Sequence, residues 1–200
     1  MTVPSLRDRQ ASLARTAIFE ALVAHLERGD ADEVPMEDLA QEAGVSRRTL
    51  YRYFPTRAAL LADAAEWIRD EVLQLPVDIG DEGITASFRA AAERVADRPE
   101  LARALLRTTT GRSLRSDYRR ARVDAIRGAL QREVPGLPRR DLDRAAPVLS
   151  YLCSSSAWIT VQDESGLGAR DAHAAVAWAI DTLLAQLRDS VPVPKRGGKR

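Results

Sequence analysis

The sequence contains few of the residues on which enzyme and metal sites depend. Among its 200 residues are one cysteine, Cys153, and two histidines, His25 and His173. A single cysteine excludes an intrachain disulfide and a cysteine-based zinc site. The two histidines are far apart and lie among alanine and aliphatic residues, so they predict neither a metal-binding pair nor a neighbouring catalytic triad. We therefore expect no enzymatic activity, no metal and no cofactor.

Long apolar runs are missing as well. No stretch approaches the roughly 18 consecutive apolar residues that a membrane-spanning helix needs. Residues Met1–Gln10 carry charges but no apolar signal core. The sequence therefore predicts a cytoplasmic protein with no membrane partner. No segment alternates apolar and polar residues with a period of two, so we expect an all-α fold.

The net charge of the chain is small, but charges of each sign are concentrated in particular segments. The net charge is only +1, which argues against a protein that coats nucleic acid by charge alone. Between Gly44 and Leu60, however, there are four arginines and no acidic residue, whereas residues 30–42 carry six acidic residues and no basic one. The positive charge is therefore local.

Apolar residues at three- and four-residue steps predict about nine helices, separated by glycine and proline breakers. The expected helices are Arg9–Arg28, Met36–Ala43, Ser46–Phe54, Thr56–Leu75, Ile84–Asp97, Pro99–Thr109, Leu114–Val134, Arg139–Gln162 and Ala169–Ser190. The residues that follow, 191–200, are rich in proline, glycine, lysine and arginine, and we expect a disordered basic tail.

The second and third of these helices, with a short turn at Gly44, have the spacing of a helix-turn-helix. In this motif the second helix enters the major groove of DNA. Its exposed side here is predicted to carry Arg47, Arg48, Thr49, Arg52 and Tyr53. Arginine can donate two hydrogen bonds to guanine, and hydroxyl groups suit phosphate oxygens. On charge pattern alone, a solvated basic helix in another all-α protein remains an alternative.

The segment from Leu39 to Leu61 resembles the N-terminal signature of the TetR/AcrR family of transcriptional regulators. It contains Ala-Gly-Val-Ser at 43–46, Leu-Tyr-Arg-Tyr-Phe at 50–54, a short turn, Arg57 and an apolar pair. The resemblance implies phosphate contacts from Ser46, Tyr51, Tyr53 and Arg57, and base contacts from Arg47, Arg48 and Thr49. The chain departs from many relatives at the start of the first motif helix, where Val34-Pro35-Met36 replaces a capping Thr or Ser.

The resemblance also implies a three-helix DNA-binding domain over 1–55 and a helical ligand-binding and dimerisation domain over 56–190. A homodimer would bind a palindromic operator in double-stranded DNA, and repression is the commoner mode in the family. We expect a small apolar or aromatic effector. The candidate pocket residues are Trp67, Phe88, Leu105, Thr108, Thr109, Tyr118 and Tyr151. The candidate dimer-interface residues are Val148, Leu152, Ile159, Trp178 and Leu184.

Two other functions remain open at this stage. A helical protein–protein adaptor that does not use its helix-turn-helix on DNA is favoured by the acidic residues of segment 30–42 and by Pro35. A regulator without small-molecule control would lack a cavity in its second domain. Repression or activation, the effector, the operator and a role of the tail in DNA binding do not follow from the sequence.

Overall fold

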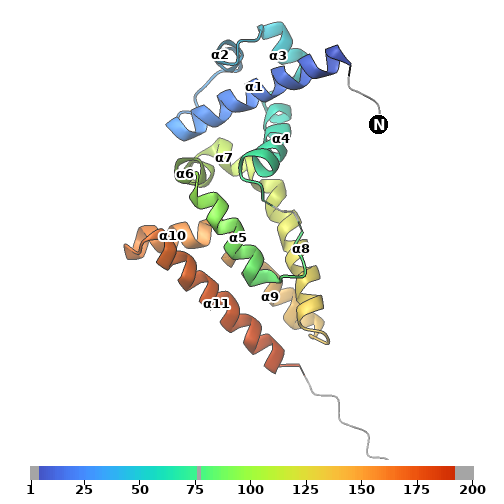
Figure 1. Cartoon of the computed structure of the whole chain (residues 1–200), viewed down its shortest axis with the longest axis vertical. Helices are drawn as coiled ribbons and strands as arrows, with labels where there is room; N and C mark the ends of the chain where they lie inside the picture. The colour runs from blue at the N-terminus through green and yellow to red at the C-terminus, as the bar shows by residue number, and fades with distance from the viewer. Residues whose placement is uncertain (1–4, 76–77, 192–200) are drawn as a thin grey trace, which may run out of the picture. The chain divides into compact units, whose positions relative to one another are not determined.

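The computed structural model describes residues 5–75 and 78–191 (Figure 1). Over these residues the chain forms eleven α-helices and one short π-helix, with no strand, which confirms the predicted all-α class. No helix in this part of the chain is both long and apolar enough to cross a membrane. The predicted disordered tail lies, from residue 192 onward, outside the described residues.

The chain divides into two compact units, which we describe separately. The first unit comprises Met1–Leu75 and Asp97–Asp117, and the second comprises Pro76–Ala96 and Tyr118–Arg200. Each unit is therefore built from two segments that are separate in the sequence. This division is one of packing, and the predicted division by role at residue 55 stays a prediction.

The first unit contains the predicted helix-turn-helix. Its helices are α1 (Leu6–Arg28), α2 (Met36–Glu42), α3 (Arg47–Tyr53), α4 (Arg57–Trp67), α6 (Pro99–Arg107) and α7 (Thr109–Leu114), with α4 continuing into a π-helical turn over Ile68–Val72. Local signals set several of these ends. Ser46 and Thr56 accept hydrogen bonds from the backbone N–H groups of Thr49 and Ala59, as N-caps do.

A continuous apolar core joins these helices. Leu22 of α1, Leu39 of α2, Leu50 of α3 and Leu60 of α4 have no exposed surface. Fully burying a leucine stabilises a fold by about 1.5–3 kcal/mol, so these four side chains fix how the short helices pack. The aromatic ring of Phe19 lies 5.5 Å from that of Phe54, which extends the core along α1.

Glycine is required at the contact between α6 and α7. Gly111 falls between two of the helices expected from the sequence, as a glycine break, but in the structure this residue lies inside α7. A Cβ atom at Gly111 would lie 2.5 Å from the backbone oxygen of Ala104 and 2.5 Å from the Cα atom of Leu105. The break was wrongly placed because this glycine serves the close approach of two helices and not a turn.

The second unit contains α5 (Ile84–Ala96), α8 (Ser116–Glu133, in this unit from Tyr118 on), α9 (Arg139–Leu152), α10 (Ser155–Ser165) and α11 (Ala169–Asp189). The prediction of one helix over Arg139–Gln162 was wrong, because the chain breaks between α9 and α10. Ser154 has an extended backbone and its hydroxyl donates to the carbonyl of Tyr151, 2.6 Å away. A serine that bonds to the local backbone competes with helix continuation.

Candidate functional site

The turn between α2 and α3 has the geometry that the helix-turn-helix spacing predicted. Gly44 adopts a φ of 66°, a conformation that side-chain-bearing residues rarely take. The N–H of Val45 then donates to the carbonyl of Ala40 at 2.9 Å, which closes the turn. Ser46 caps α3 and its hydroxyl also lies 2.9 Å from that of Thr49. The turn thus holds α3 firmly relative to α2.

The surface of α3 carries positive charge and no acidic residue. Arg47, Arg48 and Arg52 are all exposed, and Leu50 is the buried residue of the helix. Arg52 stacks on the ring of Tyr53, with its guanidinium carbon 4.8 Å from the ring centroid. Arg48 has no partner among the described residues. A solvent-facing guanidinium without an internal partner keeps its donors available for a nucleic-acid phosphate or a base edge.

Glu37 of α2 restrains two of the predicted DNA-contacting residues. Its Oε1 atom lies 3.1 Å from a guanidinium nitrogen of Arg47 and accepts a hydrogen bond from the Tyr51 hydroxyl at 3.2 Å. A backbone hydrogen bond, helped by Tyr51 and Arg47, lowers the pKa of Glu37, so the carboxylate is charged at neutral pH. Apart from the acidic composition of segment 30–42, nothing in the sequence predicted this arrangement.

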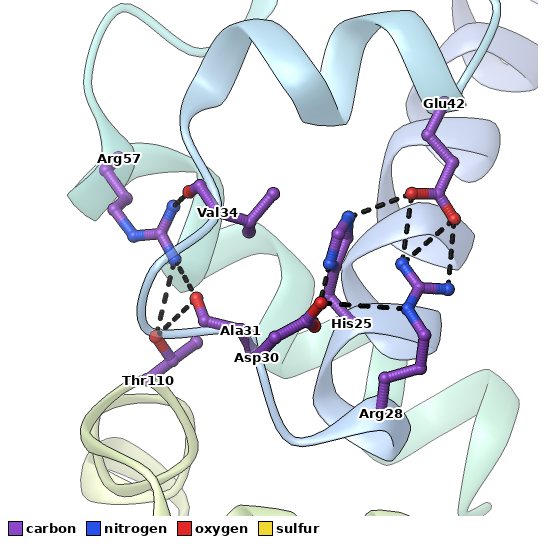
Figure 2. A network of polar contacts seen from close by, with 8 residues as sticks. All are labelled: His25, Arg28, Asp30, Ala31, Val34, Glu42, Arg57 and Thr110. Carbon is purple, nitrogen blue, oxygen red and sulfur yellow. Dashed lines mark hydrogen bonds and ion pairs between the residues drawn. The ribbon is translucent and has the colours of Figure 1, made fainter.

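Arg57, which is predicted to hold a phosphate, donates hydrogen bonds within the protein (Figure 2). It lies at the start of α4 and donates to the carbonyl oxygens of Val34, at 2.9 Å, and Ala31. One of its nitrogens also lies 3.4 Å from the Thr110 hydroxyl, which donates to Ala31. Arg57 therefore ties the loop between α1 and α2 to both α4 and α7.

A second contact fixes the same loop. The carboxylate of Asp32 accepts hydrogen bonds from the backbone N–H groups of Thr109, at 2.7 Å, and Thr110, at 2.6 Å. The first N–H groups of a helix have no acceptor within the helix, and at the start of α7 Asp32 supplies one. Although burial acts to raise the pKa of Asp32, the bonds from Thr110 and Thr109 outweigh it and lower the pKa. Asp32 thus couples α7 to the segment that leads into the helix-turn-helix.

His25 connects α1 with α2 through two carboxylates (Figure 2). Its Nδ1 atom lies 2.8 Å from Asp30 and its Nε2 atom 2.8 Å from Glu42, the latter without hydrogen-bond alignment. Arg28 completes the network, 3.1 Å from Glu42. The hydrogen bond from His25 lowers the pKa of Asp30, and the bond from Arg28 lowers that of Glu42.

The predicted pocket residues are divided between the two units. Phe88 and Tyr118 line a cavity of the second unit together. Trp67 packs on Phe19 in the first unit, where Leu105 is buried in the core. Thr108 and Thr109 belong to the start of α7, and Tyr151 is 56% exposed. Sequence reasoning missed Arg122, which also lines the cavity, because one arginine in a helix of many carries no signal of burial.

The predicted dimer-interface residues also separate into two groups. Val148 and Trp178 are exposed by 51% and 70%, which is unusual for large apolar side chains. Ile159 and Leu184 are buried within the chain itself, and Leu152 is half-buried. Tyr151 lies three residues after Val148 on α9 and is exposed with it.

The described residues contain no cluster of His, Cys, Asp or Glu suited to a metal ion.

Comparison with known proteins finds a family model that matches part of the first unit. Residues 18–64 match the family model of bacterial regulatory proteins of the tetR family. The HTH-type transcriptional repressor LfrR of Mycolicibacterium smegmatis is 37% identical over 70 residues, which are 35% of this chain and 36% of that protein. The nucleoid occlusion factor SlmA of Idiomarina loihiensis is 36% identical over 59 residues, 30% of each protein. The chain thus matches about a third of the length of these curated relatives.

Solved structures extend the likeness to nearly the whole fold. A crystal structure described as that of a TetR-family regulator from Rhodococcus sp. has a TM-score of 0.62 at 21% identity, covering 86% of this chain and 99% of that one. A TetR variant from Acinetobacter baumannii in complex with minocycline has a TM-score of 0.54 at 18% identity, covering 88% and 97%. At such identities the likeness shows the fold alone. The segment that matches the tetR-family model contains the helix-turn-helix of α2 and α3, and the described chain is similar in fold to these two structures.

Proposed function

We propose that the chain is a transcriptional regulator that binds a palindromic operator as a homodimer and acts as a repressor released by a small effector with an apolar or aromatic body. The observation that carries the proposal is the exposed face of α3, where Arg47, Arg48 and Arg52 stand on a capped helix without an acidic residue. Such a regulator works in the cytoplasm, where the chromosome lies.

The residues of α3 take different roles in this proposal. Arg48 and Thr49, near the helix N-terminus, reach base edges, since that end of a recognition helix enters the groove. Arg47 joins them once DNA displaces Glu37. Ser46, Tyr51, Arg52 and Tyr53 contact phosphates. Arg57 acts indirectly, by holding the loop before α2 in place.

The dimer forms through α9 and α11. Each helix exposes a large apolar side chain, Val148 and Trp178, and removing these from water on both subunits favours association. One helix-turn-helix covers a half-site, and two half-sites lie about 34 Å or a multiple of it apart. A palindrome is therefore the expected operator.

The experiment that tests this proposal is the selection of bound fragments from the source genome by the purified chain at two salt concentrations. Recovery of a palindrome near one operon supports a regulator, and the substrates of that operon become effector candidates. The adaptor function predicts recovery at background level at both concentrations. Reporter expression from the recovered promoter, with and without the regulator, then separates repression from activation.

A further inference from the structure

A small cavity in the second unit combines an apolar lining with one permanent positive charge. Ile84 and Phe88 of α5 and Ile126 of α8 supply apolar walls. Tyr118 and Arg122, also of α8, and Cys153 are among the other residues of the lining. Apolar walls with a few convergent polar groups are typical of sites for small organic molecules.

Arg122 forms no ion pair with a carboxylate among the described residues. Its guanidinium carbon lies 5.2 Å from the centroid of the Tyr118 ring, and its Nε donates to the hydroxyl of buried Ser150 at 3.3 Å. In the described part of the chain no carboxylate lies within ion-pair distance of it. Arg122 is half-buried, and withdrawing a charge from water without a counter-ion is unfavourable. The side chain nevertheless stays charged, because arginine does not deprotonate in proteins.

The residues around Arg122 do not neutralise its charge. Burial lowers the pKa of Arg122, and repulsion from Arg119 acts in the same direction. Burial likewise raises the pKa of Cys153 to about 12, so its thiol is neutral and offers no counter-charge. Asp78 is the acidic residue of the lining, and its side chain is exposed and makes no ion pair with Arg122.

We propose that this cavity binds a small organic carboxylate, with the carboxylate on Arg122 and an alkyl chain or a single ring against Phe88 and Ile84. The planar guanidinium can hold both oxygens of a carboxylate, which a neutral analogue cannot reproduce. Binding of the carboxylate at this site does not require DNA. Its role as the effector site rests on the regulator function proposed above.

The size of the cavity limits the ligand further. Its volume is about 40 Å³, counted for the centres of water molecules, and a water needs about 10–15 Å³ by this measure. The cavity as it stands therefore has room for a carboxylate group and little more. A wider groove, lined in part by Ala121, Ala125 and Gly128, shares Asp78 and Ile79 with it. We expect a narrow ligand body that widens the cavity on binding.

Titration calorimetry on the full chain without DNA tests the site. The probes are benzoate and octanoate, with benzamide and octanol as neutral counterparts of similar size. We expect both acids to bind at least tenfold more tightly than their neutral counterparts. Equal affinity of acids and neutral compounds, or absence of binding by both acids, would overturn the proposal without any variant.

Variants then test the residue. Arg122→Met should weaken the acids at least tenfold and leave octanol unchanged, and Arg122→Lys should give an intermediate loss. Arg170→Met, which removes an exposed arginine of α11, is the matched control and should change nothing. Thermal unfolding by circular dichroism checks that each variant is folded. Equal effects of Arg122→Met and Arg170→Met would contradict the proposal.

Operator binding separates this proposal from the regulator function. If octanoate binds and weakens operator binding by the wild-type chain but not by Arg122→Met, both hold. Acid binding without any operator binding supports the anion site and contradicts the regulator function. Operator binding with no difference between acids and neutral compounds contradicts the anion site alone.

Discussion

The acidic residues before α3 have internal partners that explain most of them. Asp30 and Glu42 face His25, Asp32 accepts from the start of α7, and Glu37 contacts Arg47. In the sequence alone, these acidic residues favoured a protein–protein adaptor as the alternative function. Their contacts instead organise the helix-turn-helix, so the acidic composition no longer argues for an adaptor.

Arg48 is the residue with the most direct expected effect on DNA recognition. Arg48→Ala should weaken binding to the preferred operator by about 1–3 kcal/mol and relax the preference at one base pair, since a bidentate arginine–guanine contact contributes about that much. Fluorescence anisotropy with operator variants measures both effects, with Arg170→Ala as control. Equal weakening on every sequence would make Arg48 a phosphate contact.

Glu37 should act in the opposite direction. Glu37→Gln removes a negative charge beside the DNA-facing surface and releases Arg47 from its ion pair. We expect tighter binding, several-fold at low salt and less at high salt, for specific and unrelated DNA alike. Asp38→Asn, at an exposed neighbouring position on α2, is the control for charge alone. An equal gain for both variants would show that the contact with Arg47 has no role.

At the scale of elements, the helix-turn-helix was predictable because its signals are local. Ser46, Thr56 and Gly44 mark helix ends by their own backbone chemistry, and Leu39, Leu50 and Phe54 mark the buried side. The roles of Gly111 and Arg122 were not predictable, because both depend on packing with residues distant in the sequence. The break at Ser154 was missed because serine is compatible with a helix and with its end.

The contact between α6 and α7 gives a stability prediction. Gly111→Ala should destabilise the protein by about 1–3 kcal/mol, because the added methyl group meets the backbone of Ala104 and Leu105. Urea unfolding followed by circular dichroism measures the change. Gly128→Ala, within α8 and without a close neighbour, should instead leave stability equal or raise it by up to about 1 kcal/mol. Similar effects of the two substitutions would contradict the close approach.

The joint between α1 and α2 should weaken in acid. Folding lowers the pKa of Asp30 and Glu42 below their ordinary values of 3.8 and 4.5. The stabilisation is therefore fully present above about pH 4.5 and is lost as the pH falls through the lowered values. A double variant, Asp30→Asn with Glu42→Gln, should show a shallower loss of urea midpoint between pH 6 and 3 than the wild type. Asp38→Asn should follow the wild type, and an identical slope in all three would contradict this network.

At the scale of the whole molecule, the regulator function requires two copies. Trp178→Glu should give monomers in sedimentation velocity, because it places a charge on each side of an interface through α9 and α11. Leu13→Glu, at an equally exposed apolar position on α1, should remain dimeric. A Trp178→Glu dimer as stable as the wild type would place the interface elsewhere.

The central claim is that α3 binds a specific DNA sequence, and equilibrium binding over a salt series tests it most directly. The wild-type chain is titrated onto the selected operator and onto a scrambled duplex between 50 and 200 mM salt. For a dimer with six to ten phosphate contacts, the account predicts that affinity falls by about 10³–10⁵ over this range while the operator stays preferred. Weak binding to both duplexes, with no difference between them at any salt concentration, would contradict it.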